Sequence, residues 1–262
     1  MAQAQGAVAP VDPRTAENRF QWQRKPALRA IYGDLYRRMA AHCAPGRTLE
    51  IGGGSGNFKE YATDVLASDI AFAPWLDLVA DAQSLPVAAR SLGNIVMFDV
   101  LHHLEFPRAF FAEAARVLRP GGRIVMVEPA ITLASWPFYR FVHPEPVRMG
   151  EDPLREGRPS AGRDPFDANQ AFPTLLATRH RQRFAALFPR LEFIRVDWLS
   201  LFAYPLSGGF RPWSAIPAGM VADVLRLESV LAPWLGRIMG FRLLLVIEAK
   251  SSPSSPASRH AL

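Results

Sequence analysis

The fold is decided by the stretch TLEIGGGSGN, residues 48–57. An apolar run that ends at Ile51 passes directly into four glycines within five positions, as a buried strand does where it turns into a helix. Glycine lets the backbone take positive φ and lets a ligand approach it closely. A plain β–α turn is the alternative interpretation. Counted from Gly52, the dinucleotide pattern G-x-G-x-x-G needs glycine where Asn57 stands, which speaks against an NAD-dependent oxidoreductase.

Two carboxylates follow at the ends of the next strand-like segments. Asp69 closes the apolar segment Val65–Asp69, nineteen residues after Glu50, and Asp81 follows Leu78–Ala80. A carboxylate at the end of the second strand meets a ribose diol in nucleotide-binding folds. An acid after the third strand can accept a hydrogen bond from an adenine amine. The pattern therefore indicates a nucleoside ligand.

Strand-like and helix-like segments alternate along the rest of the chain. Apolar residues at helical spacing predict helices at Pro26–His42, Asn57–Thr63, Arg108–Leu118 and Ala218–Met239. Further strands are predicted at Asn94–Asp99, Arg123–Glu128, Leu191–Trp198 and Phe241–Ala249. This alternation predicts an α/β fold: a Rossmann-like, seven-stranded, mostly parallel sheet with helices on both faces and an inserted cap after the fifth strand.

Composition divides the chain into three parts. Residues 1–18 are small and polar, which predicts a flexible N-terminal arm, and the Ser/Pro-rich residues 251–262 predict a disordered tail. Between them, residues 19–250 are expected to form one domain. Its cap or insertion is expected at residues 130–190, which are rich in proline, arginine and aromatic residues.

Charge and cysteine content exclude several function classes. The net charge is +6, but the basic residues are nearly all arginines and are scattered, so no nucleic-acid partner is expected. A single cysteine, Cys43, excludes an internal disulfide and a cysteine-rich zinc site, and no metal site is expected. No apolar run approaches the roughly 18–20 residues of a membrane span, and the first nine residues lack the features of a secretory signal. A cytoplasmic protein is expected.

Five motifs in order resemble the class I S-adenosylmethionine-dependent methyltransferases. They are EIGGGSG, the strand-ending Asp69, DAQSLP from Asp81, FDVLHHL at Phe98–Leu104 and LRPGGRIVMVEP at Leu118–Pro129. The resemblance is closest to the small-molecule group that includes the ubiquinone and menaquinone methyltransferases. It covers about a third of the chain and implies S-adenosylmethionine as cofactor and S-adenosylhomocysteine as product.

The resemblance also implies roles for particular residues. The glycines of the loop, Gly52, Gly53, Gly54 and Gly56, are the expected binding site of the methionine part, with Glu50 reaching its amino group. Asp69 is expected to bind the ribose hydroxyls and Ile70 to pack on adenine. Asp81 and the Ala82 amide are expected to bind the adenine edge, and Phe98 to lie near the sulfonium; simple core packing is the alternative for Phe98.

The region after the fifth strand is the expected acceptor site. Residues 131–215 hold 14 of the 28 aromatic residues of the chain, which predicts an aromatic-lined pocket as well as ordinary core. Histidine has the pKa range of a general base. The expected catalytic residues are His103, His143 and Tyr139, and His102 and Tyr204 are further candidate proton acceptors.

The sequence thus predicts a methyltransferase acting on a small hydrophobic or amphipathic acceptor. Transfer to oxygen or nitrogen is favoured over transfer to carbon. The missing Asn/Asp-Pro-Pro-Tyr/Phe motif argues against the amino-methylases of adenine and glutamine, and the missing catalytic cysteine arrangement argues against C5-cytosine chemistry. The acceptor can be lipid-like, with contact to a membrane surface through the helix at 218–239; the oligomeric state is open. A catalytically silent cofactor-binding or interaction protein, and an RNA or protein methyltransferase, are the alternatives.

Overall fold

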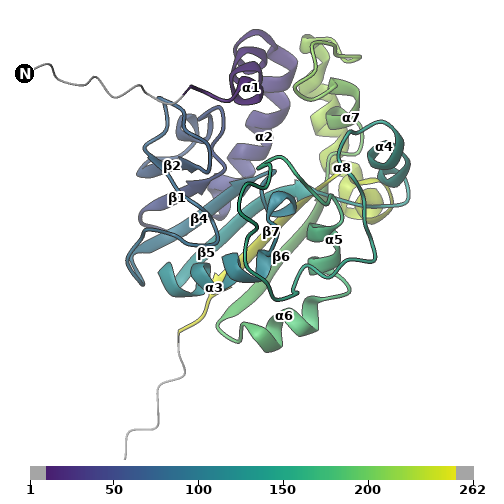
Figure 1. Ribbon diagram of the computed structural model, residues 1–262. Coiled ribbons are helices and arrows are strands. Elements are labelled where there is room, and N and C mark those ends of the chain that lie inside the picture. The colour runs from purple at the N-terminus through teal and green to yellow at the C-terminus, as the bar shows by residue number, and fades with distance from the viewer. Residues whose placement is uncertain (1–9, 252–262) are drawn as a thin grey trace, which may run out of the picture.

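The structure is a computed structural model that describes residues 10–251 (Figure 1). Its strands are β1 (Thr48–Ile51), β2 (Val65–Asp69), β3 (Leu78–Val79), β4 (Leu92–Phe98), β5 (Leu118–Pro129), β6 (Leu191–Leu199) and β7 (Arg242–Ala249). They form one seven-stranded sheet in the order β3-β2-β1-β4-β5-β7-β6. β7 is antiparallel to both of its neighbours, whereas the other pairs are parallel. The mostly parallel seven-stranded sheet is confirmed.

The strand order creates the place for a ligand. β1 pairs with β2 on one side and with β4 on the other, so the chain leaves β1 in one direction and returns on its far side. In open α/β sheets such a reversal opens a crevice at the carboxyl ends of the strands. The glycine loop begins directly after β1, at this crevice.

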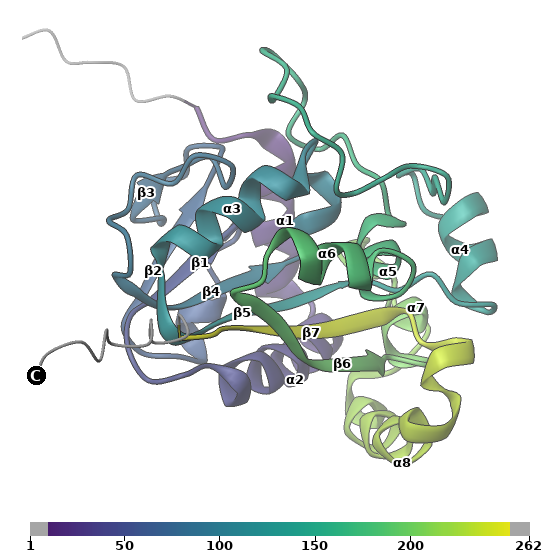
Figure 2. The same ribbon diagram turned by 90° about the horizontal axis from the view of Figure 1, so that it is seen from below.

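Helices cover both faces of the sheet (Figure 2). They are α1 (Pro13–Arg24), α2 (Pro26–His42), α3 (Pro107–Val117), α4 (Ser135–Phe141), α5 (Phe172–Ala177), α6 (Arg181–Leu187), α7 (Ala203–Ser207) and α8 (Val221–Met239), with short 3₁₀ helices at Phe58–Glu60, Leu101–His103 and Ala218–Met220. Successive residues of β5 point to opposite faces. Ile124 belongs to the core cluster that contains Phe111 of α3 and Phe184 of α6, whereas Val125 belongs to the cluster that contains Ile31 of α2.

The flexible arm expected at residues 1–18 is wrong for residues 13–18, because α1 begins at Pro13. The Asp12 carboxylate accepts a hydrogen bond from the Arg14 amide at 2.7 Å, and a proline stands in the first turn, so the helix has a proper start. Trp22 is buried against Tyr36, which anchors its far end. Residues 1–9 and 252–262, with nearly all of the expected tail, lie outside the described residues.

The helix expected at Asn57–Thr63 is also wrong. Only one 3₁₀ turn forms there, at Phe58–Glu60. Left-handed backbone at Gly56 (φ 74°) and Asp64 (φ 53°) bounds this segment on both sides. The chain instead crosses quickly from β1 to β2.

The expected insertion at residues 130–190 has two parts. α5 and α6 pack on the sheet, with Leu176 and Phe184 in the same core cluster as α3. Phe138 of α4 and the loops of residues 143–170 instead line the cavity described below. Among residues 10–251, no helix combines the length and the hydropathy needed to cross a bilayer.

Candidate active site

One cavity of about 640 Å³ lies at the carboxyl ends of β1, β2 and β4. The glycine loop, Asp69 and Asp81 line it on one side. His102, His103 and residues of the insertion line it on the other. The structure therefore brings the expected cofactor residues except Gly56, and two of the three expected catalytic residues, His103 and His143, into one space.

The glycine loop takes conformations that a side chain would disturb. Gly52 (φ 69°) and Gly54 (φ 43°) both have left-handed backbone and line the cavity. A Cβ at Gly52 would lie only 2.2 Å from a methyl group of Val100. Gly53 also lines the cavity, but Gly56 does not. A Cβ at Gly56 would meet the Trp75 ring at 2.9 Å, so this glycine permits packing behind the loop.

Asp69 fastens the loop to the end of β2. Its carboxylate accepts hydrogen bonds from the Gly54 amide at 2.9 Å and the Ala71 amide at 3.0 Å. Burial raises the pKa of Asp69. Ile70 follows on the cavity wall, and about half of its side chain is exposed. An exposed apolar side chain on the wall can pack against a planar ligand. Asp81 and Ala82 line the same wall from beyond β3.

Glu50 is the most unusual carboxyl group near the loop. It is buried at the end of β1, and its Oε2 atom has no hydrogen-bond partner. Burial raises its pKa to about 8. A buried carboxyl oxygen without a partner beside a ligand cavity suits a cationic group such as the amino group of a methionine moiety. Phe98 lies close by, stacked on Tyr32 with ring centroids 4.9 Å apart, and it also faces the cavity.

Helix α1 lies over the glycine loop. Arg19 donates a hydrogen bond to the Ser55 carbonyl at 2.5 Å, and its guanidinium lies over the Trp75 ring at 4.2 Å. The Trp75 indole in turn donates to the Gly54 carbonyl at 2.8 Å. Asn18 lines the cavity, whereas Trp22 does not. The N-terminal helix is thus part of the site wall.

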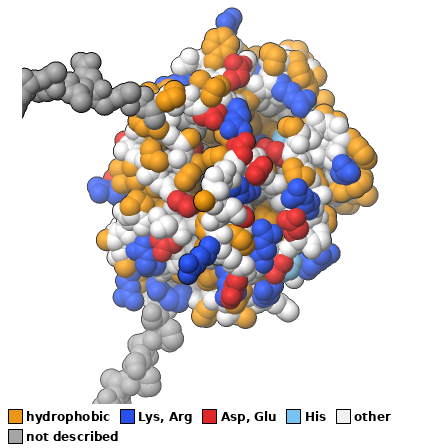
Figure 3. All heavy atoms as spheres, in the orientation of Figure 1, with side chains coloured by type: hydrophobic (Ala, Val, Ile, Leu, Met, Phe, Trp, Pro, Cys, Tyr) orange, Lys and Arg blue, Asp and Glu red, His pale blue; other side chains and the backbone are white. Residues whose placement is uncertain are grey.

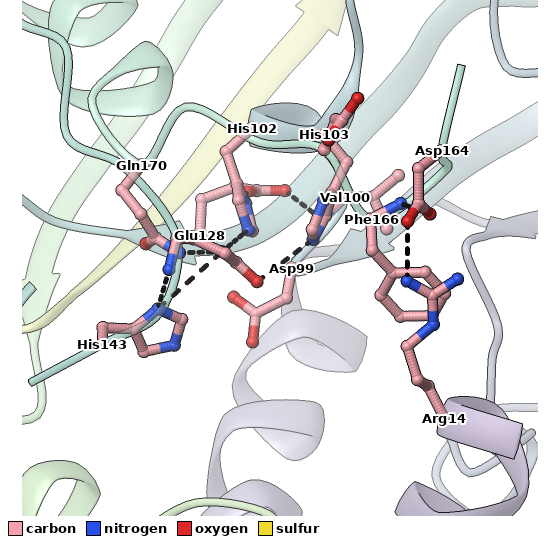
Figure 4. A network of polar contacts seen from close by, with 12 residues as sticks. Arg14, Asp99, Val100, His102, His103, Glu128, His143, Asp164, Phe166 and Gln170 are labelled. Carbon is pink, nitrogen blue, oxygen red and sulfur yellow. Dashed lines mark hydrogen bonds and ion pairs between the residues drawn. The ribbon is translucent and has the colours of Figure 1, made fainter.

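The acceptor side of the cavity contains a cluster of histidines and glutamates (Figure 4). His102 Nδ1 lies 2.7 Å from Glu128 Oε2, and His102 Nε2 lies 3.3 Å from Glu145 Oε2. His103 Nε2 and His143 Nδ1 lie 4.0 Å and 3.9 Å from the Glu145 carboxylate. Glu145 therefore stands among three imidazoles.

Burial and neighbouring charges give the three histidines different pKa values. Burial alone would lower the pKa of His102, but hydrogen bonds to Glu128 and Glu145 raise it to about 10. Burial lowers the pKa of His103 and of His143 to about 4. The pKa of Glu145 falls to about 2, because the hydrogen bond and charge of His102 outweigh burial. Near neutral pH, His103 and His143 are the neutral imidazoles of the cluster.

One expectation about an individual residue is wrong. Tyr139 does not line the cavity: it is buried, and its hydroxyl donates a hydrogen bond to the Phe241 carbonyl at 2.8 Å. Burial holds its pKa well above the ordinary value, so it is not a proton acceptor. Arg242 is the first residue of β7. It is almost fully buried, paired with Asp99, and lies over the Tyr204 ring at 3.8 Å.

Aromatic residues form much of the remaining wall. Of the 14 in residues 131–215, five line the cavity: Phe138, Phe166, Tyr204, Phe210 and Trp213. Others, such as Phe184 and Phe193, belong to the core. Within the described residues, the aromatic side chains of this region therefore contribute both to the cavity wall and to the core, as expected.

Sequence reasoning missed several residues of the acceptor side. Glu145, Asp99 and Gln170 line the cavity, and the Gln170 amide donates a hydrogen bond to Glu145. The nearest signal was the segment FYRFVHPEPV around His143, which contains Glu145 two residues later. Glu145 and His102 are 43 positions apart in the sequence, so no local sequence pattern predicts their contact.

Comparison with known proteins places these features in a family context. Residues 49–126 match a family model described as a methyltransferase domain. A malonyl-[acyl-carrier protein] O-methyltransferase of Hahella chejuensis is 53% identical over 47 residues, which are 18% of this chain and 17% of that protein. A demethylmenaquinone methyltransferase of Renibacterium salmoninarum is 33% identical over 104 residues, 34% of this chain and 44% of that protein.

The chain spans less than half the length of these two relatives. Among solved structures, a SAM-dependent methyltransferase from Archaeoglobus fulgidus aligns with a TM-score of 0.49 at 12% identity, over 85% of this chain and 94% of that one. The family match falls on the glycine loop, Asp69 and β1 to β5. Residues 49–126 accordingly match a methyltransferase domain, and both relatives named above are methyltransferases.

Proposed function

We propose that the chain transfers the methyl group of S-adenosylmethionine to a small hydrophobic or amphipathic acceptor. One observation carries the proposal: the glycine loop and the histidine–glutamate cluster line the same cavity. S-adenosylmethionine, when bound, supplies a methyl group that its sulfonium has already activated. The protein then has to orient the acceptor and exclude water.

Each cofactor residue has a specific task in this proposal. Gly52, Gly53 and Gly54 hold the methionine part, and Gly56 shapes the loop from behind. The unpartnered Glu50 oxygen accepts from the amino group. Asp69 accepts from the ribose hydroxyls, and Ile70, Asp81 and Ala82 hold the adenine. Phe98 faces the sulfonium with its ring, because aromatic faces attract cations.

The acceptor lies between the aromatic wall and the histidines. Phe138, Phe210 and Trp213 contact its apolar body. His143 or His103, neutral because burial lowers the pKa of each to about 4, takes a proton from an oxygen or nitrogen nucleophile. This role for the histidines favours transfer to oxygen or nitrogen over transfer to carbon.

A lipid-like acceptor also suits the outer surface of the protein. Helix α8 leaves Val230 and Trp234 exposed, with Arg226 and Arg237 also at the surface. An apolar acceptor is scarce in water and collects in membranes. We therefore propose that α8 contacts an anionic lipid surface. On the face drawn in Figure 3, basic and acidic side chains are interspersed, which is unlike a phosphate-tracking surface.

The test uses radiolabelled S-adenosylmethionine and cell extract fractionated by polarity. We expect label to move into an organic-soluble small molecule, and an Asp69→Ala variant to lose this transfer. Label in protein or RNA would contradict the small-molecule proposal. Cofactor binding without any transfer would identify a catalytically silent binding protein.

A further inference from the structure

The histidine–glutamate cluster has the donor set of a transition-metal site. His102 Nε2 and His103 Nε2 lie 3.3 Å and 4.0 Å from the two oxygens of Glu145. One ligand atom from each of these three residues lies within 4.8 Å of the others. Ligands that surround one ion at about 2.0–2.2 Å stand at similar separations from one another.

A second layer of contacts orients these donors. Glu128 binds His102 Nδ1, so Nε2 is the atom turned toward Glu145. The other Glu128 oxygen accepts hydrogen bonds from the amides of Val100 and Leu101, at 2.9 Å and 2.7 Å. A carboxylate that fixes the far nitrogen of a histidine ligand is a regular feature of metal sites. A divalent cation would take the place of the proton that His102 carries between Glu128 and Glu145, so these two carboxylates still face a positive charge.

The cluster is also accessible from one side. His102, His103 and Glu145 all line the cavity, so an ion held by three protein ligands keeps a position open toward the acceptor. We propose that His102, His103 and Glu145 bind a divalent first-row metal ion such as Zn²⁺ or Co²⁺. This departs from the sequence-based expectation of no metal site.

The metal site deepens the proposed function and narrows its acceptor class. An oxygen on the open position has a lowered pKa, so the acceptor is a phenol, enol or diol. Its proton passes to His143, the oxygen bonds to the methyl carbon, and the carbon–sulfur bond breaks with its electrons kept by sulfur. This consequence rests on the proposed function, whereas the metal site itself does not.

The test is a Co²⁺ titration of the tag-free chain, followed by visible absorption and by metal analysis after gel filtration. We expect a single Co²⁺ per chain, with the intense absorption of a low-symmetry site, displaced by Zn²⁺. His103→Ala and Glu145→Gln should each weaken Co²⁺ binding about 10- to 100-fold or more. His180→Ala is the matched control, because His180 pairs with Asp152 outside the cavity. Circular dichroism verifies that each variant folds.

Absence of bound Co²⁺ and Zn²⁺ from the folded wild-type chain would overturn the metal site. So would binding that His103→Ala and Glu145→Gln leave unchanged. Neither readout requires methyl transfer, so failure of the metal site leaves the proposed methyltransferase standing. Conversely, a chain that binds Co²⁺ in this cluster but transfers no methyl group would refute only the proposed function.

Discussion

Asp69 holds the backbone of the glycine loop and faces the cavity at the same time. Asp69→Ala removes an acceptor for the ribose hydroxyls, so we expect the affinity for S-adenosylhomocysteine to fall by about 1.5–3 kcal/mol, the scale of a hydrogen bond to a charged group. Titration calorimetry measures the change. Asp69→Asn keeps one acceptor oxygen for the Gly54 amide and should lose less.

Asp223→Ala is the control for this substitution, because Asp223 lies exposed on α8 and outside the cavity. It should bind S-adenosylhomocysteine like the wild type. If Asp69→Ala also binds normally while its melting temperature is unchanged, the assignment of the ribose site is wrong.

Glu50 links cofactor binding to pH. Burial raises its pKa to about 8, so the free chain holds this carboxyl protonated at pH 7. A cationic amino group beside it favours the ionised form and lowers the pKa, so binding at pH 7 should release a proton. Affinity should therefore increase as the pH rises toward about 8. Calorimetry in two buffers of different ionisation enthalpy counts the proton.

The Glu50→Gln variant checks the source of that proton, because an amide does not titrate. Proton release that persists in this variant would assign it to another group. The same raised pKa affects folding: the folded chain binds a proton that the unfolded chain has lost between pH 4.5 and about 8. The stability of the wild type should decline across that window, and Glu50→Gln should decline less.

At the scale of elements, Lys25 joins α1 and α2 to the loop after α7. Its ammonium, which has three N–H groups, lies 2.5–2.8 Å from four backbone carbonyl oxygens, those of Ser207, Gly209, Arg211 and Trp213. This loop carries Phe210 and Trp213 into the cavity. Lys25→Met keeps the apolar stem and removes the donors, so hydrogen exchange of residues 207–213 should become faster and the acceptor KM should rise.

Lys59→Met is the matched control for Lys25→Met. Lys59 forms a half-exposed ion pair with Asp77, and such pairs contribute little to stability. Hydrogen exchange at residues 207–213 should be unaffected in this control. Equal protection of the loop in wild type and Lys25→Met would show that the ammonium does not hold it.

Local pattern was sufficient for the elements around the cofactor but not for the acceptor side. The apolar run before Gly52 and the acid at Asp69 depend on neighbours in sequence, so the β1 turn and the end of β2 were predictable. Tyr139 was misassigned because its partner, the Phe241 carbonyl, lies 102 residues away. Glu145 was missed for the same reason, since only the folded insertion brings it to His102.

At the scale of the whole molecule, one apolar surface lies outside the core. On α8, Leu227, Val230, Trp234 and Ile238 follow the helical repeat and are each more than half exposed, with Trp234 at 83%. Leu133 adjoins them, because the amide of the next residue, Ala134, donates to the Ile238 carbonyl. Exposed apolar residues grouped in this way mark interaction surfaces.

The proposed partner of this face is an anionic bilayer. Vesicles containing phosphatidylglycerol should sediment with the chain, and vesicles of phosphatidylcholine alone should bind it less, because Arg226 and Arg237 are attracted by anionic lipid. Trp234→Ser should reduce binding, whereas Phe20→Ser, which removes an exposed aromatic ring from α1, should not.

If Trp234→Ser binds vesicles like the wild type, α8 is not the contact. A different result is that the wild type does not bind vesicles and sediments as a dimer, which Trp234→Ser dissociates. In that case a second copy of the chain covers this face, and the acceptor must reach the cavity from water.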